Sequence, residues 1–328
     1  MKILFFLMSV LLFSGCNYMS RTEMGKRALN RKDYPRAAES FSIALQEDRN
    51  SAEAYCLRGY SYYKQGMYEK ALKDFSRSDE LRDSFSAHYG LALAYLELNE
   101  KNKAEKQFSA AINAAPDSPW GYWLRGNFYL WSCNNADEAY NNYKEALLLA
   151  PENINIQVAY ARSLFCSGRY DECLAFLQNS LKENEKALSL EVELAAFLVF
   201  VPDSSLRNPG EAIRILKSVM IILNDDPAPW EVLARAYALQ GEFSKAVPAV
   251  RKAIKYSSKL ENNVWSDMYR NTLSDALNAY SEKRIENDPS HFINRLYILH
   301  TATMMPILGL NTACLLYTSP SPRDVEES

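Results

Sequence analysis

The chain has 328 residues, of which 48% are hydrophobic and 23% charged, and its 37 basic and 40 acidic residues leave a formal charge of −3. This near-neutral balance provides no basic surface for a phosphate backbone, so we expect no nucleic-acid partner. Because the chain has only 11 Gly and 13 Pro, abundant Ala, Leu, Glu and Lys, and little β-branched alternation, we expect an all-α protein.

The first 15 residues have the form of an export signal. Lys2 precedes an unbroken apolar and small-residue run that ends in Phe13, Ser14 and Gly15 before Cys16. This run is shorter than the roughly 20 residues that span a bilayer as a helix, so residues 1–15 are interpreted as a signal peptide.

Ser14-Gly15-Cys16 resembles a bacterial lipobox, although Phe13 stands where Leu is most usual. The resemblance implies cleavage before Cys16, lipidation of Cys16 and a protein anchored in the bacterial envelope, facing the periplasm. Asn17 follows the cysteine, which in the enterobacterial sorting rule implies the outer membrane. The alternative is a plain secretory signal with an incidental cysteine.

Residues 52–84 hold a pattern that recurs along the chain at a period of about 34 residues. Its small and aromatic positions are Tyr55, Gly59, Tyr62, Gly66, Ala71 and Phe75. This pattern resembles the tetratricopeptide repeat (TPR), which implies a right-handed α-solenoid of about seven helix–turn–helix repeats. Residues 16–260 are assigned to it, in units at 18–51, 52–84, 85–118, 119–153, 154–187, 188–226 and 227–260.

Each unit has a small residue in the middle of its expected first helix and an Ala step in its second. Two packed helices need small side chains where their axes approach most closely. The fourth unit has one extra residue, which we place in the turn at 133–137, and the sixth has a longer connection at 202–210.

The region at 261–313 is expected to hold a capping helix and an incomplete C-terminal part. A helix over 262–284 would cover the apolar face of the last repeat, since a solenoid must cover its end. Its apolar stripe consists of Trp265, Met268, Tyr269, Leu273, Leu277 and Tyr280.

The last residues, 314–328, are interpreted as a sequencing artefact. Cys314 to Asp324 reads CLLYTSPSPRD, which resembles the in-frame translation of a common transposase-type sequencing adapter. We therefore expect the genuine sequence to end at or just before Ala313, which leaves a further domain open.

No catalytic or metal-binding arrangement is found. None of the three histidines, His88, His291 and His300, lies at metal-ligand spacing from another His or a Cys, and no Gly-rich phosphate loop is present. We interpret His88 as a helix residue near a repeat junction and the Asp79-Glu80 pair as turn or solvated residues. We thus expect no enzyme, no metal and no cofactor.

Four cysteines remain besides Cys16 and Cys314. Cys166 and Cys173 are the best candidates for a disulfide in an oxidising periplasm. Alternatively, Cys173 is a small buried thiol, because other repeats carry Ala at its position.

The TPR resemblance implies a concave groove lined mainly by the first helices. An aromatic groove can hold a peptide or helix, because rigid rings bury much area at low entropy cost. The alternative is that some of these rings pack between repeats. The predicted groove residues are Tyr60, Tyr63, Lys64, Tyr89, Leu93, Trp120, Trp123, Asn127, Leu130, Trp131, Arg162, Phe165 and Phe200.

Tyr60 and Trp123 stand where chaperone-binding TPR domains would need the polar residues of a carboxylate clamp, which disfavours a co-chaperone. We expect a non-catalytic, lipid-anchored scaffold for a protein or peptide partner, with assembly of an envelope, pilus or secretion complex as a candidate process. The alternative is the N-terminal recognition arm of a larger enzyme or envelope machine, truncated at its C-terminus.

Overall fold

The computed structural model describes residues 20–184, 187–260 and 264–285. These residues divide into two compact units, whose boundary along the chain falls between Ala115 and Pro116. Within the described ranges the regular structure is entirely helical, without a strand. The helices form seven successive pairs and one further helix there, so the expected all-α repeat class is confirmed.

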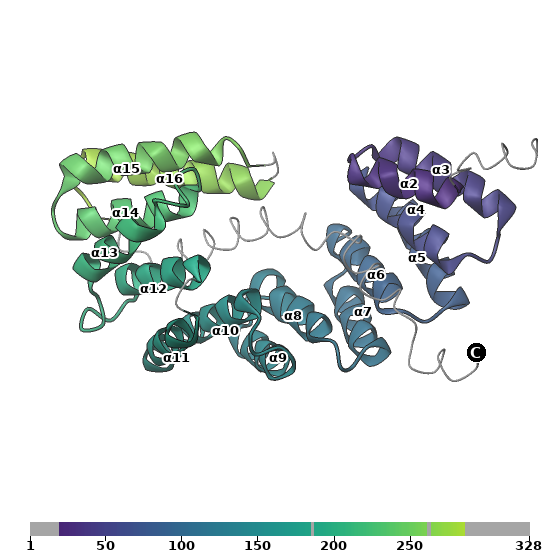
Figure 1. Cartoon of the computed structure of the whole chain (residues 1–328), viewed down its shortest axis with the longest axis horizontal. Helices are drawn as coiled ribbons and strands as arrows, with labels where there is room; N and C mark the ends of the chain where they lie inside the picture. The colour runs from purple at the N-terminus through teal and green to yellow at the C-terminus, as the bar shows by residue number, and fades with distance from the viewer. Residues whose placement is uncertain (1–19, 185–186, 261–263, 286–328) are drawn as a thin grey trace, which may run out of the picture. The chain divides into compact units, whose positions relative to one another are not determined.

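The first unit consists of three helix pairs. In each pair a short turn joins two helices that pack against each other, and each second helix packs on the next first helix (Figure 1). The helices are α2 (Arg21–Asn30), α3 (Tyr34–Glu47), α4 (Ala52–Lys64), α5 (Tyr68–Leu81), α6 (Phe85–Glu97) and α7 (Lys101–Ala114).

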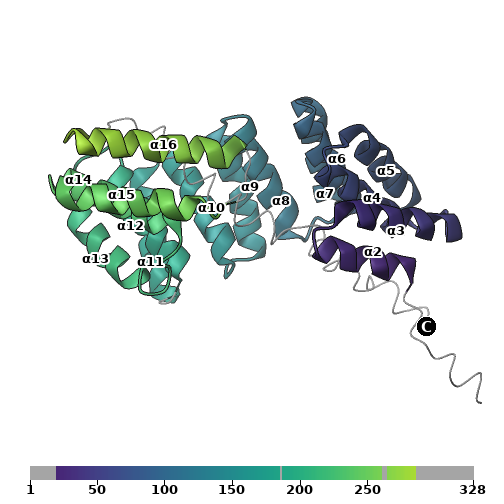
Figure 2. The same cartoon turned by 90° about the horizontal axis from the view of Figure 1, so that it is seen from above.

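The second unit repeats this arrangement and adds α16, which packs along α15 (Figure 2). Buried Tyr269, Leu273 and Tyr280 of α16 share an apolar cluster with Ala246 and Val250 of α15. The elements are α8 (Pro119–Asn127), η1 (Phe128–Ser132), α9 (Ala136–Leu149), α10 (Ile154–Cys166), α11 (Tyr170–Glu183), α12 (Leu188–Phe200), α13 (Pro209–Val219), α14 (Pro227–Leu239), α15 (Phe243–Ser257) and α16 (Val264–Ser281).

Glycine allows an aromatic ring to lie against the first helix of a pair. A Cβ atom added at Gly25 would lie 2.5 Å from Cε1 of Phe41, and one at Gly126 would lie 2.7 Å from Cε1 of Tyr143. Both rings are fully buried. Because no larger side chain fits, the glycine and the ring together fix how closely the two helices pack.

A recurring turn ends the first helices. In the second pair Met67 N donates to Tyr62 O at 2.9 Å, across five residues, after Gly66 has adopted a φ of 73°. The same closure ends α16, where Arg284 N donates to Ala279 O at 2.8 Å. Each of these turns contains one residue with a positive φ; in chain order these residues are Lys32, Gly66, Asn99, Gly168, Gly241 and Lys283.

The extra residue of the fourth repeat lies in the first helix. The prediction that it lies in the turn at 133–137 was wrong. The helix α8 opens into the π-helical segment η1, and Asn135 N donates to Tyr129 O at 2.8 Å, across six residues instead of five. A π-helical turn accommodates one residue more than an α-helical turn without breaking the helix. The left-handed residue, Asn134, is therefore retained.

The longer connection of the sixth repeat lies between α12 and α13. Asn208 N closes it by donating to Leu198 O at 3.0 Å. The Arg207 guanidinium donates from Nε to Val201 O at 2.7 Å and from Nη2 to Pro202 O at 3.0 Å. These bonds satisfy carbonyl groups at the end of α12.

Cys166 and Cys173 are both thiols and are not joined in a disulfide. Cys173 is buried, and its Sγ donates to Ala161 O at 3.2 Å. Burial raises the pKa of Cys166 to about 12. The structure therefore has Cys166 and Cys173 as thiols withdrawn from water, not as a disulfide.

Several expectations fall outside the described residues. They concern the signal peptide at 1–15, lipidation of Cys16, the region from 286 to 313 and the adapter-like segment at 314–328. The side chains of Trp265 and Met268 also lie outside them. No helix in the described ranges combines the length and apolar character needed to cross a membrane.

Candidate functional site

In the first unit, the predicted groove residues of α4 form part of a tyrosine cluster. The Tyr60 and Tyr63 rings stack at a centroid distance of 6.4 Å, and Tyr63 lies 5.8 Å from the Tyr68 ring. Glu97, at the end of α6, accepts from the Tyr63 hydroxyl at 3.1 Å and from the Tyr68 hydroxyl at 3.2 Å. Removal from water, reinforced by this carboxylate, raises the pKa of Tyr63, so its hydroxyl remains a donor.

Tyr89 and Lys64 differ in exposure. Tyr89 is buried on α6, where it stacks with Phe85 at 6.2 Å, and burial raises its pKa well above the usual range. Lys64 is exposed at the end of α4, with its ammonium group 5.9 Å from the Tyr34 ring centroid. A cation and two half-buried tyrosine rings are thus accessible on this helix.

In the second unit, three of the predicted groove residues are tryptophans: Trp120, Trp123 and Trp131. Trp120 and Trp123 of α8 meet edge to face, with centroids 6.2 Å apart and planes at 84°. Trp123 is only 3% exposed, whereas Trp120 and Trp131 are half-buried against the cluster that contains Leu130 and Tyr143. Trp123 is therefore chiefly a packing residue, and the accessible ring surface belongs to Trp120 and Trp131.

Two polar groups of this unit are held in place. Asn127 Oδ1 accepts from the Tyr143 hydroxyl at 2.8 Å, which orients the amide. Arg162 of α10 donates from Nε and Nη2 to the two carboxylate oxygens of Glu193 on α12, at 2.8 and 2.9 Å. Both side chains of this ion pair are largely buried. The pair joins two consecutive repeats, because Arg162 and Glu193 lie on their first helices, and it fixes the orientation of the Arg162 guanidinium group.

Phe165 packs between repeats. It is buried and meets the Phe197 ring at 6.0 Å and the Tyr170 ring at 5.5 Å, both edge to face. Leu93, Leu130 and Phe200 are buried as well. The alternative that some of the predicted groove rings pack within the scaffold therefore applies to four of them: Tyr89, Trp123, Phe165 and Phe200.

Two acidic partners, Glu97 and Glu193, were not among the predicted groove residues. A usable signal was the separation, because Tyr63 and Glu97 lie 34 residues apart, as do Asp225 and Lys259, which pair at 2.9 Å. Arg162 and Glu193 are separated by 31 residues. Complementary residues about one repeat apart occupy similar positions in consecutive units and can therefore face each other.

Comparison with known families assigns the repeat. Models described as tetratricopeptide repeat match residues 52–78, 68–119 and 130–190. Together with the paired helices, these matches show tetratricopeptide repeats in the chain. Proteins of this family generally act as non-catalytic scaffolds for protein interaction.

A crystal structure with the same fold is a tetratricopeptide repeat protein from Parabacteroides merdae. It aligns with a TM-score of 0.60 and 16% identity over 80% of this chain and 97% of that one.

Two curated relatives match this chain over only part of their own length. DnaJ homolog subfamily C member 3 of Gallus gallus is 22% identical over 244 residues, 71% of this chain and 41% of the relative. Peptidyl-prolyl cis-trans isomerase FKBP4 of Mus musculus is 24% identical over 181 residues, 49% of this chain and 39% of the relative. The chain thus spans less than half the length of either relative.

Proposed function

We propose that this chain is a non-catalytic scaffold that binds a protein or peptide segment on the accessible faces of its first helices. The observation that carries the proposal is the set of half-buried rings and oriented polar groups on those helices. Tyr60, Tyr63 and Lys64 belong to it in the first unit, and Trp120 and Trp131 in the second. A large rigid ring that retains accessible surface can bury further area against a partner at low entropy cost.

The proposed contacts combine apolar area with directional polar groups. Lys64 would attract a carboxylate of the partner, while the tyrosine and tryptophan rings would cover its apolar side chains. Asn127, whose oxygen is engaged by Tyr143, is suited to offer its amide N–H groups to a peptide carbonyl.

One double variant and one single control variant test this proposal. Trp120→Ala combined with Trp131→Ala should abolish partner capture in a pull-down from envelope extracts while the helical circular dichroism persists. Trp230→Ala is the matched control, because Trp230 is also half-buried on a first helix but its indole N–H donates to Asn224 O at 2.9 Å and Lys252 lies 3.9 Å from its ring centroid. Equal capture by both variants would contradict the proposal.

We further propose that the scaffold is held at the bacterial envelope by lipid on Cys16, facing the periplasm from the outer membrane. The support is the lipobox-like sequence alone. Several acyl chains, at about 0.8 kcal/mol per buried methylene, would hold the protein on a membrane durably. Radiolabelled palmitate should enter the wild type and not Cys16→Ser; equal labelling of both would contradict lipidation at Cys16.

A second candidate is the recognition arm of a longer enzyme or envelope machine. It is favoured by the relatives, which extend well beyond the matched region and include an isomerase. Sequencing the locus through the position of Ala313 tests it: a continuing reading frame with a further domain supports this candidate, and a stop codon soon after that position contradicts it.

A further inference from the structure

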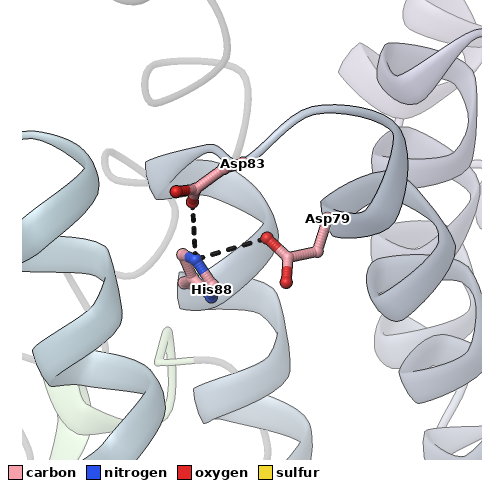
Figure 3. Close-up of side chains that lie close together, drawn as sticks. All are labelled: Asp79, Asp83 and His88. Atoms are coloured by element: carbon pink, nitrogen blue, oxygen red, sulfur yellow. Dashed lines mark hydrogen bonds and ion pairs between the residues drawn. The ribbon is translucent and has the colours of Figure 1, made fainter.

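Three potential metal ligands converge at the junction of the second and third repeats (Figure 3). Asp79 lies in the last turn of α5, Asp83 in the connection and His88 in the first turn of α6. The His88 Nε2 atom lies 2.8 Å from Asp83 Oδ1 and 3.2 Å from Asp79 Oδ1. One ligand atom from each residue lies within 4.8 Å of the other two.

The other ring nitrogen fixes the orientation of the imidazole. His88 Nδ1 lies 2.9 Å from Gln107 Oε1, on α7. This contact with the Gln107 amide fixes the ring with its Nδ1 edge toward α7 and leaves Nε2 on the side of the two aspartates. Nε2 faces two carboxylate oxygens. A metal ion between these three atoms would be bound by the imidazole nitrogen and neutralised by the carboxylates.

The surroundings of Asp79 point to a ligand. Its Oδ1 atom is buried and accepts no hydrogen bond from the residues that the structure describes. His88 Nε2 lies 3.2 Å from it and is hydrogen-bonded to Asp83 Oδ1 instead. A buried carboxylate oxygen without a donor is costly, and a cation in the centre of the cluster would satisfy it.

We propose that Asp79, Asp83 and His88 bind a divalent transition-metal ion, for which Zn²⁺ is the natural probe. Imidazole combined with carboxylates favours such an ion over Mg²⁺ or Ca²⁺, which prefer oxygen ligands alone. Tetrahedral zinc, with bonds of about 2.0 to 2.1 Å, places its ligand atoms about 3.3 Å apart. The two distances from Nε2, 2.8 and 3.2 Å, need only a small expansion, and the two carboxylate oxygens lie within 4.8 Å of each other.

The exposures of the three side chains suit a site with one open position. The His88 side chain is 12% exposed and that of Asp79 is 31% exposed, whereas Asp83 is 76% exposed. A water molecule can therefore complete the coordination from the Asp83 side. Because its ligands come from α5, the connection and α6, the bound ion would join two consecutive repeats.

The expectation of no metal relied on His and Cys spacing, and it did not consider this carboxylate set. The signal is Asp79 in the last turn of a helix, Asp83 four residues later in the connection, and His88 five residues after that in the next helix. The connection brings the three together, although no single helix places them on one face.

Isothermal titration of the untagged full-length chain with ZnCl₂ tests the proposal, with MgCl₂ as the comparison ion. We expect saturable binding of one Zn²⁺ per chain at this site and no competing binding of Mg²⁺. His88→Ala should lose this binding, and Asp83→Asn should weaken it at least tenfold. Gln107→Leu should weaken it by about 10 to 100-fold through the loss of ring orientation.

Asp117→Asn is the matched control, because it removes an exposed carboxylate outside the cluster and should leave the affinity unchanged. Asp83 is largely exposed, so Asp83→Asn should keep the fold and decide the question even where His88→Ala does not fold. Equal zinc affinity in wild type and Asp83→Asn would overturn the proposal, as would the absence of saturable binding in the wild type.

Discussion

The two units use the same packing device and present different chemistry on their first helices. In both, a glycine on the first helix faces an aromatic ring on the second: Gly59 with Phe75 in one unit, Gly126 with Tyr143 in the other. The accessible α4 rings are tyrosines, one of them bonded to Glu97, whereas α8 and η1 offer tryptophans. The repeat pattern therefore determines the packing, and the remaining positions determine what each unit can bind.

The largest expected effect comes from the ion pair between repeats of the second unit. Glu193→Gln removes the charge partner of the largely buried Arg162 and should lower the free energy of unfolding by about 3 kcal/mol. Urea denaturation followed by circular dichroism measures it. Asp225→Asn is the control, since its pair with Lys259 is mostly exposed and should contribute at most about 1 kcal/mol. Equal effects would contradict the structural role of the buried pair.

The shared glycine device should be equally sensitive in both units. Gly25→Ala and Gly126→Ala each force a methyl group against a buried ring and should each cost about 1 to 3 kcal/mol. Thermal melting measures the loss. Gly210→Ala is the control, because its added Cβ would have no neighbour closer than 3.5 Å and a helical alanine is favourable. A neutral result in one unit alone would show that the device is not shared.

Tyr143→Phe makes the second unit resemble the first at this position, where the earlier pairs carry Phe41 and Phe75. It removes the hydroxyl that donates to Asn127, while the ring and its packing remain. We expect a loss of about 0.5 to 1.5 kcal/mol, measured by urea denaturation. A loss as large as that of Gly126→Ala would mean that the hydroxyl, and not the ring, dominates this contact.

The smallest stability effect is expected at the tyrosine cluster of the first unit. Tyr63→Phe removes one of the two hydroxyl donors to Glu97 while Tyr68 still donates to it, and should cost less than about 1 kcal/mol. The free energy of partner binding should fall by more than the free energy of unfolding. Capture of the partner at matched protein concentration measures the loss of binding. Tyr68→Phe removes the other donor and is the control, because Tyr68 lies on a second helix.

The sequence was sufficient for features that repeat and insufficient for those that depend on neighbouring repeats. Gly25, Gly59 and Gly126 could be recognised as packing positions because their spacing recurs. The π-helical segment could not be placed, since an extra residue is accommodated equally well by a turn or by a helix. Trp123 is buried in a cluster that also contains Ile156 and Ala159 of the next repeat, which its position within one repeat does not reveal.

Site-specific photocrosslinking in cells that express the full-length chain tests whether a protein partner binds on the first helices. A photoreactive amino acid replaces Trp120 or Lys64 on the first helices, or Lys73 or Lys144, which are exposed on second helices. We predict that the first-helix positions form adducts with a discrete protein partner and that the second-helix positions do not. Adducts confined to Lys73 and Lys144 would contradict partner binding on the first helices.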